Sequence, residues 1–311
     1  MRNKSTQMVF DLVKLDKRVL AVTADNRNEI YNEIRMTCPS QYIEYGIAEE
    51  NMVASCAGLA SCGYIPFLYT ITNFMSMHAF EFIRNDVCIG NRNVKFLGRS
   101  AALVSSSMGA THQGTEELGL LRALPNLVVI TPATPIEARE ATRFAYHHNG
   151  PVYIRLEGFH ELELYDDGYG YVLGESRVVR EGSDISVFTM GSVIHEALIA
   201  ASRLKKEKGL ELEVINVPTI KPLCEQNILD SIRKTGRVVT LEEHSVYGGL
   251  GSVIAEIIAK NKLAVDFHMM GLDGCAQGCG NRGEIRQINH LTEKDLMEEC
   301  IKMIGFEERM L

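Results

Sequence analysis

The 311-residue sequence has no apolar run that approaches the roughly 20 residues needed for a membrane-spanning helix. It also has no excess of basic side chains, because 40 acidic residues outnumber 32 lysines and arginines and give a net charge of -8. That balance argues against a surface that binds nucleic acid. The first 18 residues carry several charges, so we expect an amphipathic helix there and no signal peptide. These absences favour a cytoplasmic globular protein with neither a membrane nor a nucleic-acid partner.

The cysteine pattern gives little support for metal or redox chemistry. Eight cysteines are scattered along the chain, and only Cys275 and Cys279 lie close together. Their spacing is not C-x-x-C, and no second pair accompanies them. We therefore expect reduced, mostly buried thiols and no metal ligands in this chain.

Length and composition predict two globular domains. The chain is longer than one average domain, and its 46% hydrophobic and 23% charged residues are ordinary for a soluble protein. Short apolar runs alternate with helical patterns in both halves, which indicates parallel sheets covered by helices on both faces. We predict strands at 18–24, 65–69, 94–98, 127–131 and 152–156 in the first half, and at 185–189, 212–216, 237–241 and 264–268 in the second.

The clearest predicted helix begins at Thr134-Pro135-Ile136-Glu137, a capping box with proline at the first helical position. Glycines and aspartates between the two halves indicate a hairpin or linker. The predicted fold is two consecutive three-layer α/β domains with mostly parallel sheets, at 1–160 and 185–311, joined by a linker at 161–184. The predicted helices are 135–148 in the first half and 193–208, 225–234, 251–261 and 292–304 in the second.

One segment, residues 42–53, indicates chemistry. Its sequence is Tyr-Ile-Glu-Tyr-Gly-Ile-Ala-Glu-Glu-Asn-Met-Val, so Glu49 stands where an extended apolar run turns into a helix of small residues. Such a helix packs close to its neighbours, which predicts a buried carboxyl group. A buried acid without a basic partner is costly unless it holds a proton or meets a ligand nitrogen. Glu49 is therefore the first indication of an enzyme.

Four regions together resemble the transketolase family. The likeness covers nearly the whole chain and corresponds to the C-terminal two-thirds of a thiamine-diphosphate-dependent transketolase. It implies a pyrimidine-binding domain followed by a transketolase C-terminal domain. The regions are 44–53 within the segment above, Thr-Ile-Thr-Asn-Phe-Met-Ser at 70–76, Gly-Ala-Thr-His-Gln-Gly at 109–114, and, in the second domain, Thr-Ile-Lys-Pro-Leu at 219–223 with Glu-Glu-His-Ser-Val-Tyr-Gly-Gly-Leu-Gly at 242–251.

One family motif is missing. Transketolases bind the diphosphate and Mg²⁺ through a G-D-G motif and a later asparagine, and no Gly-Asp-Gly occurs in this sequence. The sequence also begins where the pyrimidine-binding domain is expected to begin. The resemblance therefore implies one subunit of a split transketolase, with an N-terminal partner subunit that carries the diphosphate-binding domain and the Mg²⁺ ligands. We expect a heterotetramer, and no activity from this chain alone.

The resemblance gives Glu49 a role at the cofactor. In the family, a carboxyl group hydrogen-bonded to the pyrimidine ring shares its proton, and the cofactor's own 4′-amino group then removes the proton from the thiazolium C2. Glu49 would be this catalytic acid, Ile47 beside it would contact the cofactor, and Glu50 stands where the family usually has Gln. The alternative is that Glu49 or Glu50 is only a negative charge favoured at a helix N-terminus.

Phe74 falls in the segment that resembles the family's T-F-x-N-F, where an aromatic ring stacks on the aminopyrimidine. Ile71 replaces the other aromatic residue of that pattern, so this wall of the cofactor site would be aliphatic. His78, next to Met77, is expected to line the same pocket on the substrate side. Ordinary core packing is the alternative for these residues.

His112 falls on the family's T-H-Q position, where the imidazole hydrogen-bonds the hydroxyls or oxyanion of a bound ketose and can shuttle a proton. It lies in a glycine-flanked polar loop, and a purely structural histidine is the alternative. Arg99 and Ser100 lie near the position expected for a phosphate ligand, so they are further candidates for substrate binding. His244 matches a second-domain segment that approaches the cofactor in the family, and its role stays open.

Two departures from the family bear on the substrate. Transketolases carry an acid just before the T-H-Q loop, whereas residues 105–109 here are Ser-Ser-Ser-Met-Gly. The family's sugar-phosphate clamp uses an arginine soon after the strand predicted at 152–156, and Gly158 holds that position, while Arg155 corresponds to a different, earlier arginine. Because arginine is the natural fork for phosphate, we expect a pocket for an unphosphorylated or unusually substituted sugar.

Three functions are open from the sequence. The first is a split transketolase that moves a two-carbon ketol unit from a ketose to an aldose. The second keeps the cofactor but changes the reaction, as in 1-deoxyxylulose-5-phosphate synthase or the beta subunit of a 2-oxo acid dehydrogenase. The third is a non-catalytic scaffold subunit. Retention of Glu49, Phe74 and His112 together favours catalysis, because a degenerate copy would be expected to lose Glu49.

Overall fold

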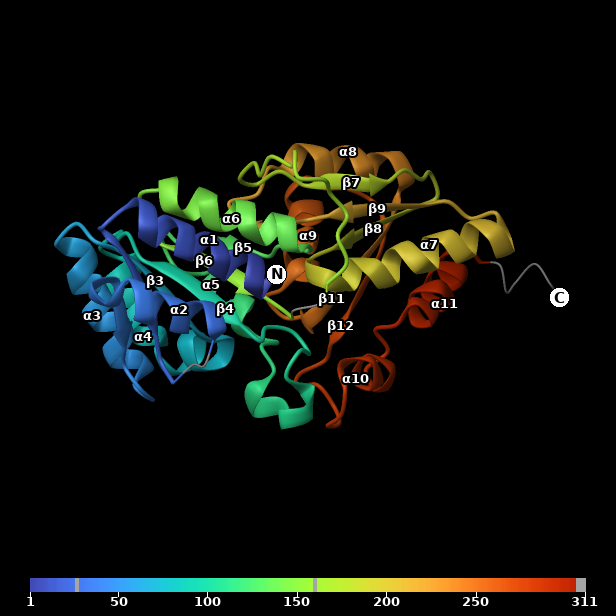
Figure 1. Ribbon diagram of the computed structural model, residues 1–311. Coiled ribbons are helices and arrows are strands. Elements are labelled where there is room, and N and C mark those ends of the chain that lie inside the picture. The colour runs from blue at the N-terminus through green and yellow to red at the C-terminus, as the bar shows by residue number, and fades with distance from the viewer. Residues whose placement is uncertain (26–27, 159–160, 306–311) are drawn as a thin grey trace.

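The computed structural model describes residues 1–25, 28–158 and 161–305 and contains two mostly parallel sheets that lie beside each other (Figure 1). Each sheet has one antiparallel edge strand. In spatial order, the seven-stranded sheet consists of β10 (Thr219–Lys221), β5 (Val128–Ile130), β6 (Val152–Leu156), β4 (Lys95–Arg99), β3 (Ile65–Ile71), β1 (Val19–Thr23) and β2 (Tyr42–Glu44). The five-stranded sheet consists of β12 (Asp266–Leu272), β11 (Arg237–Ser245), β8 (Ile185–Thr189), β9 (Leu212–Asn216) and β7 (Arg177–Arg180).

Helices cover both faces of the first sheet, so its central strands are buried on both sides. Every residue of β1 and of β6 is buried, as expected for strands inside an α/β layer. Figure 1 shows α1 and α6 side by side over one face. The helices on that face are α1 (Arg2–Leu15), α2 (Glu29–Thr37) and α6 (Pro135–His147), and those on the other face include α3 (Glu49–Ser61), η3 (Ile83–Cys88) and α5 (Glu117–Leu121), with α4 (Phe80–Phe82) beside them.

The second sheet is also covered on both faces. The helices on one face are α7 (Ile194–Lys208), α10 (Arg282–Ile288) and α11 (Glu293–Ile304), and those on the other are α8 (Glu225–Thr235) and α9 (Leu250–Lys260). Side chains of α8 and α9 belong to the same hydrophobic cluster as side chains of α3 and α5. The two halves therefore share a core, which holds them in a fixed relation. In the described part of the chain, no helix combines the length and the apolar character needed to cross a membrane.

The predicted α/β architecture is confirmed, and most predicted elements differ from the observed ones only at their ends. The predicted strands 152–156, 185–189 and 212–216 coincide with β6, β8 and β9. Three short strands were not predicted: β2, β7 and β10. Strand β7 lies inside the predicted linker 161–184, and β10 crosses from the second half of the chain to pair with β5. The proposed domain boundaries stay predictions.

The predicted capping box of α6 forms only in part. The Thr134 hydroxyl accepts from the backbone N–H of Glu137 at 3.2 Å, as predicted. The Glu137 carboxylate, however, accepts from the backbone N–H of Ala133 and from Tyr169 and Asn216 instead of returning to Thr134. Asn216 lies on β9, so burial between the two halves redirects the Glu137 side chain. Burial also raises the pKa of this carboxyl above its usual value.

Candidate active site

Glu49 is the first residue of α3, and its side chain is only 3% exposed. Gly46 precedes it with a φ of +62°, a conformation that lets the chain turn from β2 into the helix. Small residues on α3 allow close packing, and Met52, Val53 and Cys56 enter the core beside it. The predicted burial of this carboxyl is confirmed. Its position in the first helical turn is also one that the helix dipole favours.

His78 bridges the two neighbouring glutamates. Its Nδ1 lies 3.7 Å from Oε2 of Glu49, and its Nε2 lies 2.7 Å from Oε1 of Glu50. Among the described residues, His78 is the only lysine, arginine or histidine within 4 Å of the Glu49 carboxylate. His78 ends η2 (Phe74–His78), a π-helical turn. Such turns are rare in proteins overall, and those that occur are often found at functional sites.

Phe74 and His112 contact each other edge to face. Their ring centroids are 5.2 Å apart and the rings are inclined by 75°. His112 ends η5 (Ala110–His112), and its Nδ1 shares a hydrogen bond of 2.9 Å with the hydroxyl of Thr111. Two residues that the sequence separates by a strand and a helix-rich segment are thus brought together at one site.

Asn73 ties the His112 loop to η2. Its Nδ2 donates to the backbone oxygens of Gln113 at 2.7 Å and of Thr111 at 3.3 Å. The buried Oδ1 of Asn73 and both amide atoms of the buried Gln113 have no hydrogen-bond partner among the described residues. Buried polar atoms of this kind call for an explanation, such as a water or a ligand.

The other end of the loop, at Gly114, packs against the residues that follow β3 and β4. The backbone N–H of Ala102 donates to the oxygen of Gly114 at 2.7 Å. A Cβ atom at Gly114 would lie 2.9 Å from Thr72 Cγ2 and 3.0 Å from Ala101 Cα, so only glycine allows this approach. Ser100 and Ala102 both have a positive φ, near 58° and 59°, which is uncommon outside glycine and clusters at functional sites.

A hollow of about 450 Å³ opens beside the Phe74 ring. Two predicted site residues line it, Phe74 and His78. Its lining residues are Asn73, Phe74, Met77, His78, Ala110, Thr111, Glu116 and Cys275. His112 adjoins this hollow through its contact with Phe74.

Glu49 and four other predicted residues are not among the described residues that line this hollow. Ile47 is 81% exposed at the surface. Ile71 and Arg99 end the neighbouring strands β3 and β4, opposite each other in register, and Ser100 follows Arg99. Burial lowers the pKa of the Arg99 guanidinium. Their assignments to cofactor and substrate stay predictions.

Two lining residues, Glu116 and Cys275, lie outside the segments that carry the family resemblance. Glu116 closely follows the Thr-His-Gln segment, so its position in the sequence was an available signal. Cys275 lies in the loop after β12 and reaches the hollow only because the two halves pack together, for which the sequence gives no local signal. The Cys275 thiol lies 3.7 Å from Oε1 of Glu116.

Buried charges lie behind the His112 loop. Arg155 on β6 is 1% exposed and donates to the carboxylates of Glu117 at 2.6 Å and Glu157 at 3.3 Å. The same guanidinium donates to the backbone oxygens of Gly114 and Glu243, both at 2.9 Å. The carboxylates of Glu117 and Glu157 hold the pKa of Arg155 above its usual value. Arg155 therefore joins the loop to β11 of the second half.

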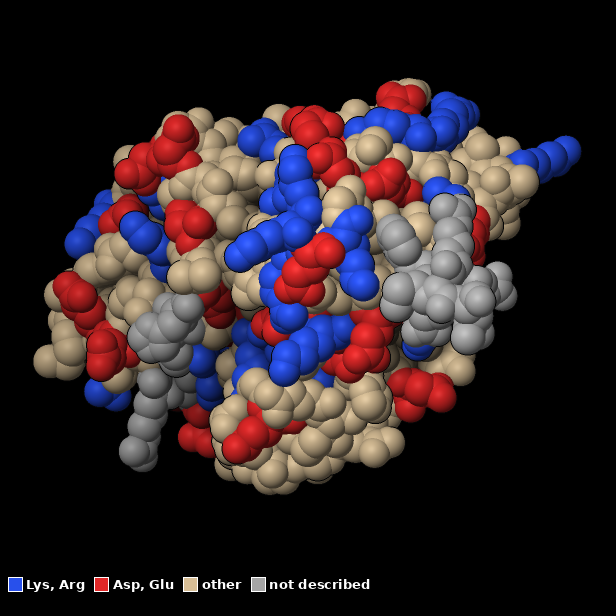
Figure 2. All heavy atoms as spheres, turned by 90° about the vertical axis from the view of Figure 1, so that its right-hand side faces the viewer, with Lys and Arg blue, Asp and Glu red and all other residues tan. Residues whose placement is uncertain are grey.

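Helix α10 continues this network. Arg282 donates to the carboxylates of Glu243 and Glu157, and Arg286 donates to Glu243 and to Glu196. The two arginines hold the pKa of the Glu243 carboxyl well below its usual range. Figure 2 shows Lys and Arg side chains interspersed with Asp and Glu on the face that lies at the right of Figure 1. Arg282 and Arg286 are both paired with glutamates.

His244 on β11 is fully buried and touches the first half. Its Nδ1 donates to the oxygen of Ser245 at 2.7 Å, and its Nε2 accepts from the backbone N–H of Leu118 at 3.2 Å. Burial and the nearby Arg155 lower the pKa of His244 to about 3, which agrees with a neutral ring in these roles. Gly248 meets Gly119 in the same contact, where a Cβ on Gly248 would lie 2.5 Å from Gly119 Cα. His244 therefore positions α5 and does not line the hollow.

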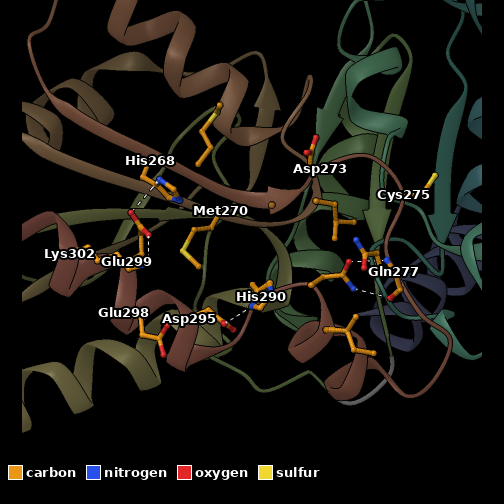
Figure 3. Close-up of a pocket in the computed structure, with 15 residues that line it drawn as sticks. His268, Met270, Asp273, Cys275, Gln277, His290, Asp295, Glu298, Glu299 and Lys302 are labelled. Carbon is orange, nitrogen blue, oxygen red and sulfur yellow. Dashed lines mark hydrogen bonds and ion pairs between the residues drawn. The ribbon is translucent and has the colours of Figure 1, made fainter.

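A second hollow of about 440 Å³ lies in the second half, between β12 and α11 (Figure 3). Two pairs of its ionisable side chains interact: His268 lies 3.3 Å from Glu299, and His290 lies 3.2 Å from Asp295. Figure 3 shows Cys275 at its far edge, so the loop after β12 separates the two hollows. In the described residues, no group of three or more His, Cys, Asp or Glu side chains could hold a metal ion.

The hollow beside Phe74 suits one end of the cofactor that the resemblance implies. A buried carboxylate with a single imidazole neighbour can meet a ring nitrogen, and the Phe74 ring offers a face for an aromatic ligand. Asn73, whose buried amide oxygen has no hydrogen-bond partner among the described residues, lines the same hollow. The described residues around this hollow include no lysine or arginine that could take a diphosphate. The site therefore fits the pyrimidine end alone.

Comparison with known proteins gives two family matches. The family model for the pyrimidine binding domain of transketolase matches residues 1–158, and the model for the transketolase C-terminal domain matches residues 174–295. The second match begins inside the segment predicted as a linker.

Individual proteins resemble this chain over most of its length. It is 32% identical to an apulose-4-phosphate transketolase subunit of Actinobacillus succinogenes, over 85% of each chain. It is also 32% identical to the 6-deoxy-6-sulfo-D-fructose transketolase subunit SqwH of a Clostridium species, over 96% of this chain and 92% of that one. A solved structure described as a split gene transketolase, inactive beta4 tetramer, superposes with a TM-score of 0.89 at 31% identity and covers 98% of both chains.

Proposed function

The chain belongs to the transketolase family, and from this premise we propose that it is the catalytic subunit of a split transketolase that moves a two-carbon ketol unit from a ketose to an aldose. Dependence on thiamine diphosphate follows from the family. The observation that carries the proposal is the buried Glu49 carboxylate. It lies next to His78, and His78 lines the hollow together with Phe74. A scaffold subunit would have no need to keep a buried acid there.

Each residue at the hollow has a distinct task in this proposal. When bound, thiamine diphosphate supplies the carbon nucleophile that two-carbon transfer requires. Glu49 holds a proton against the pyrimidine ring nitrogen, and Phe74 packs on the ring. His112, held at the edge of Phe74 and by Thr111 at Nδ1, hydrogen-bonds the substrate hydroxyls and moves a proton at Nε2.

The remainder of the active site belongs to a partner in this proposal. The relatives' names and the split-gene tetramer imply a partner subunit and an oligomer. We place the diphosphate-binding domain and the Mg²⁺ ligands on that N-terminal subunit, because Gly-Asp-Gly is missing here. A heterotetramer with each subunit present twice is the assembly we infer. The cytoplasmic location stays a prediction, as does the identity of the sugars.

Reconstitution tests this function. The chain is combined with the subunit that carries the G-D-G motif, and ketol transfer from hydroxypyruvate to D-ribose is measured with and without thiamine diphosphate. We expect activity only when both subunits and the cofactor are present. Glu49→Ala should reduce turnover to background with an unchanged circular dichroism spectrum, whereas Glu207→Gln, at the exposed Glu207 on α7, should behave as wild type. Full turnover in Glu49→Ala would refute the role of Glu49.

Calorimetry on the chain alone tests the division of the site between subunits. We expect weak binding of thiamine diphosphate without the partner, because the chain holds only the pyrimidine end. Tight, Mg²⁺-dependent binding to the isolated chain would place the diphosphate site on this subunit instead.

A further inference from the structure

The hollow beside Phe74 contains an acid that the sequence motif lacks. Residues 105–109, where transketolases carry an acid, are Ser-Ser-Ser-Met-Gly. Glu116 nevertheless places a half-buried carboxylate in the lining that also contains Phe74 and His78. The acid in this site is therefore Glu116, which follows the C-terminal end of the His112 loop.

Neutral donors hold the Glu116 carboxylate in place. Oε2 accepts from the hydroxyl of Thr115 at 2.8 Å, and Oε1 faces the thiol of Cys275 at 3.7 Å. Among the described residues, no lysine, arginine or histidine lies within 4 Å of it, and the only basic side chain in the lining is that of His78, which pairs with Glu50. Each carboxylate oxygen accepts from about two donors, so Glu116 keeps acceptor capacity toward the hollow.

The charges around the hollow decide which ligand end can approach. Glu116 is an acceptor without a cation, and Glu50 adds a second carboxylate beside His78. A hydroxyl donates to such a group, whereas a phosphate or sulfonate meets a like charge and would lose its hydration without a cationic partner. Arg155 and Arg282 are committed to buried glutamates, and Arg99 is not among the residues that line the hollow.

We propose that Glu116 is a specificity-determining residue, which accepts hydrogen bonds from sugar hydroxyls and so selects substrates whose end at this position is hydroxylated and uncharged. The inference rests on the proposed transketolase function and adds to it the substrate class. The second half of the chain contributes Cys275, which closes the wall behind the carboxylate.

The kinetic test uses the reconstituted complex of both subunits with thiamine diphosphate, Mg²⁺ and hydroxypyruvate as the ketol donor. D-ribose and D-ribose 5-phosphate form a matched pair of acceptors that differ by the phosphate. In Glu116→Gln we expect the KM for D-ribose to rise about tenfold with little change in kcat, as when a charged hydrogen-bond acceptor is removed. The preference for the phosphorylated acceptor should rise in Glu116→Gln and further in Glu116→Arg. Glu207→Gln, the same change at an exposed site, should leave both acceptors unaffected.

A second readout does not depend on turnover. Iodoacetamide labelling of the complex, followed by peptide mass spectrometry, reports access to Cys275, with the exposed Cys62 and Cys224 as internal controls. D-ribose should protect Cys275 in wild type and fail to protect it in Glu116→Gln. Unchanged KM values and unchanged protection in Glu116→Gln would overturn the role of Glu116 while leaving the transketolase function intact. If the complex transfers no ketol unit to any acceptor, the proposed function fails, and protection of Cys275 alone then decides whether Glu116 binds the sugar.

Discussion

Arg155 and Glu117 form a buried ion pair, with Nε 2.6 Å from Oε1, and the same guanidinium donates to the backbone oxygen of Gly114 at the end of the His112 loop. Both side chains are at most 1% exposed. One arginine thus couples the stability of the junction between the two halves to the geometry of the candidate active site.

Removing Arg155 should destabilise the protein strongly. Arg155→Met leaves the Glu117 carboxylate buried without its partner, and breaking a buried pair in this way costs about 3–5 kcal/mol. Urea unfolding of the purified chain measures the loss. The double variant Arg155→Met/Glu117→Gln should recover part of the stability, because the stranded charge is gone. Equal unfolding midpoints for wild type and Arg155→Met would contradict a structural role for the pair.

Asn73 should control the mobility of the His112 loop. In Asn73→Asp, the donor that faces the oxygens of Thr111 and Gln113 becomes an acceptor, so two hydrogen bonds are replaced by repulsion. We expect faster amide hydrogen exchange across residues 109–114, with a stability loss of about 1–3 kcal/mol. Exchange in α11, far from the loop, serves as the internal control. Unchanged protection of the loop would show that Asn73 does not hold it.

Phe74 and His112 should affect different quantities in the reconstituted complex. Phe74→Ala removes the ring that packs on the pyrimidine, so the affinity for thiamine diphosphate should fall by about three- to tenfold. His112→Ala removes a group that acts on the substrate, so kcat/KM should fall by about two to four orders of magnitude with cofactor affinity unchanged. Cofactor titrations followed by steady-state kinetics separate the two effects. A common loss of cofactor affinity in both variants would contradict the division of roles.

The alternation of buried runs was enough to predict both sheets, since strands buried on both faces, such as β6 and β8, leave a clear apolar signal. The missed strands lack that signal. β10 has only three residues and becomes a strand because Thr219 and Lys221 pair with β5 of the other half. β7 is an edge strand with partly exposed residues, so its sequence is indistinguishable from a polar linker.

In the candidate site, too, some residues could be predicted from sequence motifs and others depend on long-range packing. The resemblance to family motifs singled out Glu49, Phe74 and His112, and the structure brings Phe74 against His112. Cys275 and Glu116 lie 159 residues apart, and their contact depends on how the halves pack. No local pattern in the sequence reports such packing, so the part of the wall that Cys275 forms could not be predicted before the structure.

Glu242 should give the stability of this protein a distinctive pH dependence. Its carboxylate is fully buried, accepts from the backbone N–H groups of Leu250 and Gly251, and lies near His244, Glu117 and Arg155. Burial raises the pKa of Glu242 to about 7 from its usual 4.5. The folded state therefore binds more protons than the unfolded state between those values, and the contribution of Glu242 to stability is lost as the pH rises through 7.

Glu242→Gln isolates this effect, because an amide does not titrate. His244 contributes with the opposite sign, since its pKa is lowered to about 3 and its burial favours the folded state increasingly as the pH rises toward 6.5. That contribution is common to wild type and variant, so it cancels in their difference. Between about pH 5 and pH 8, the variant should gain up to roughly 3 kcal/mol relative to wild type. Urea unfolding of both proteins across this range measures the difference, and a constant offset at every pH would show that Glu242 ionises in the folded protein as it does in the unfolded chain.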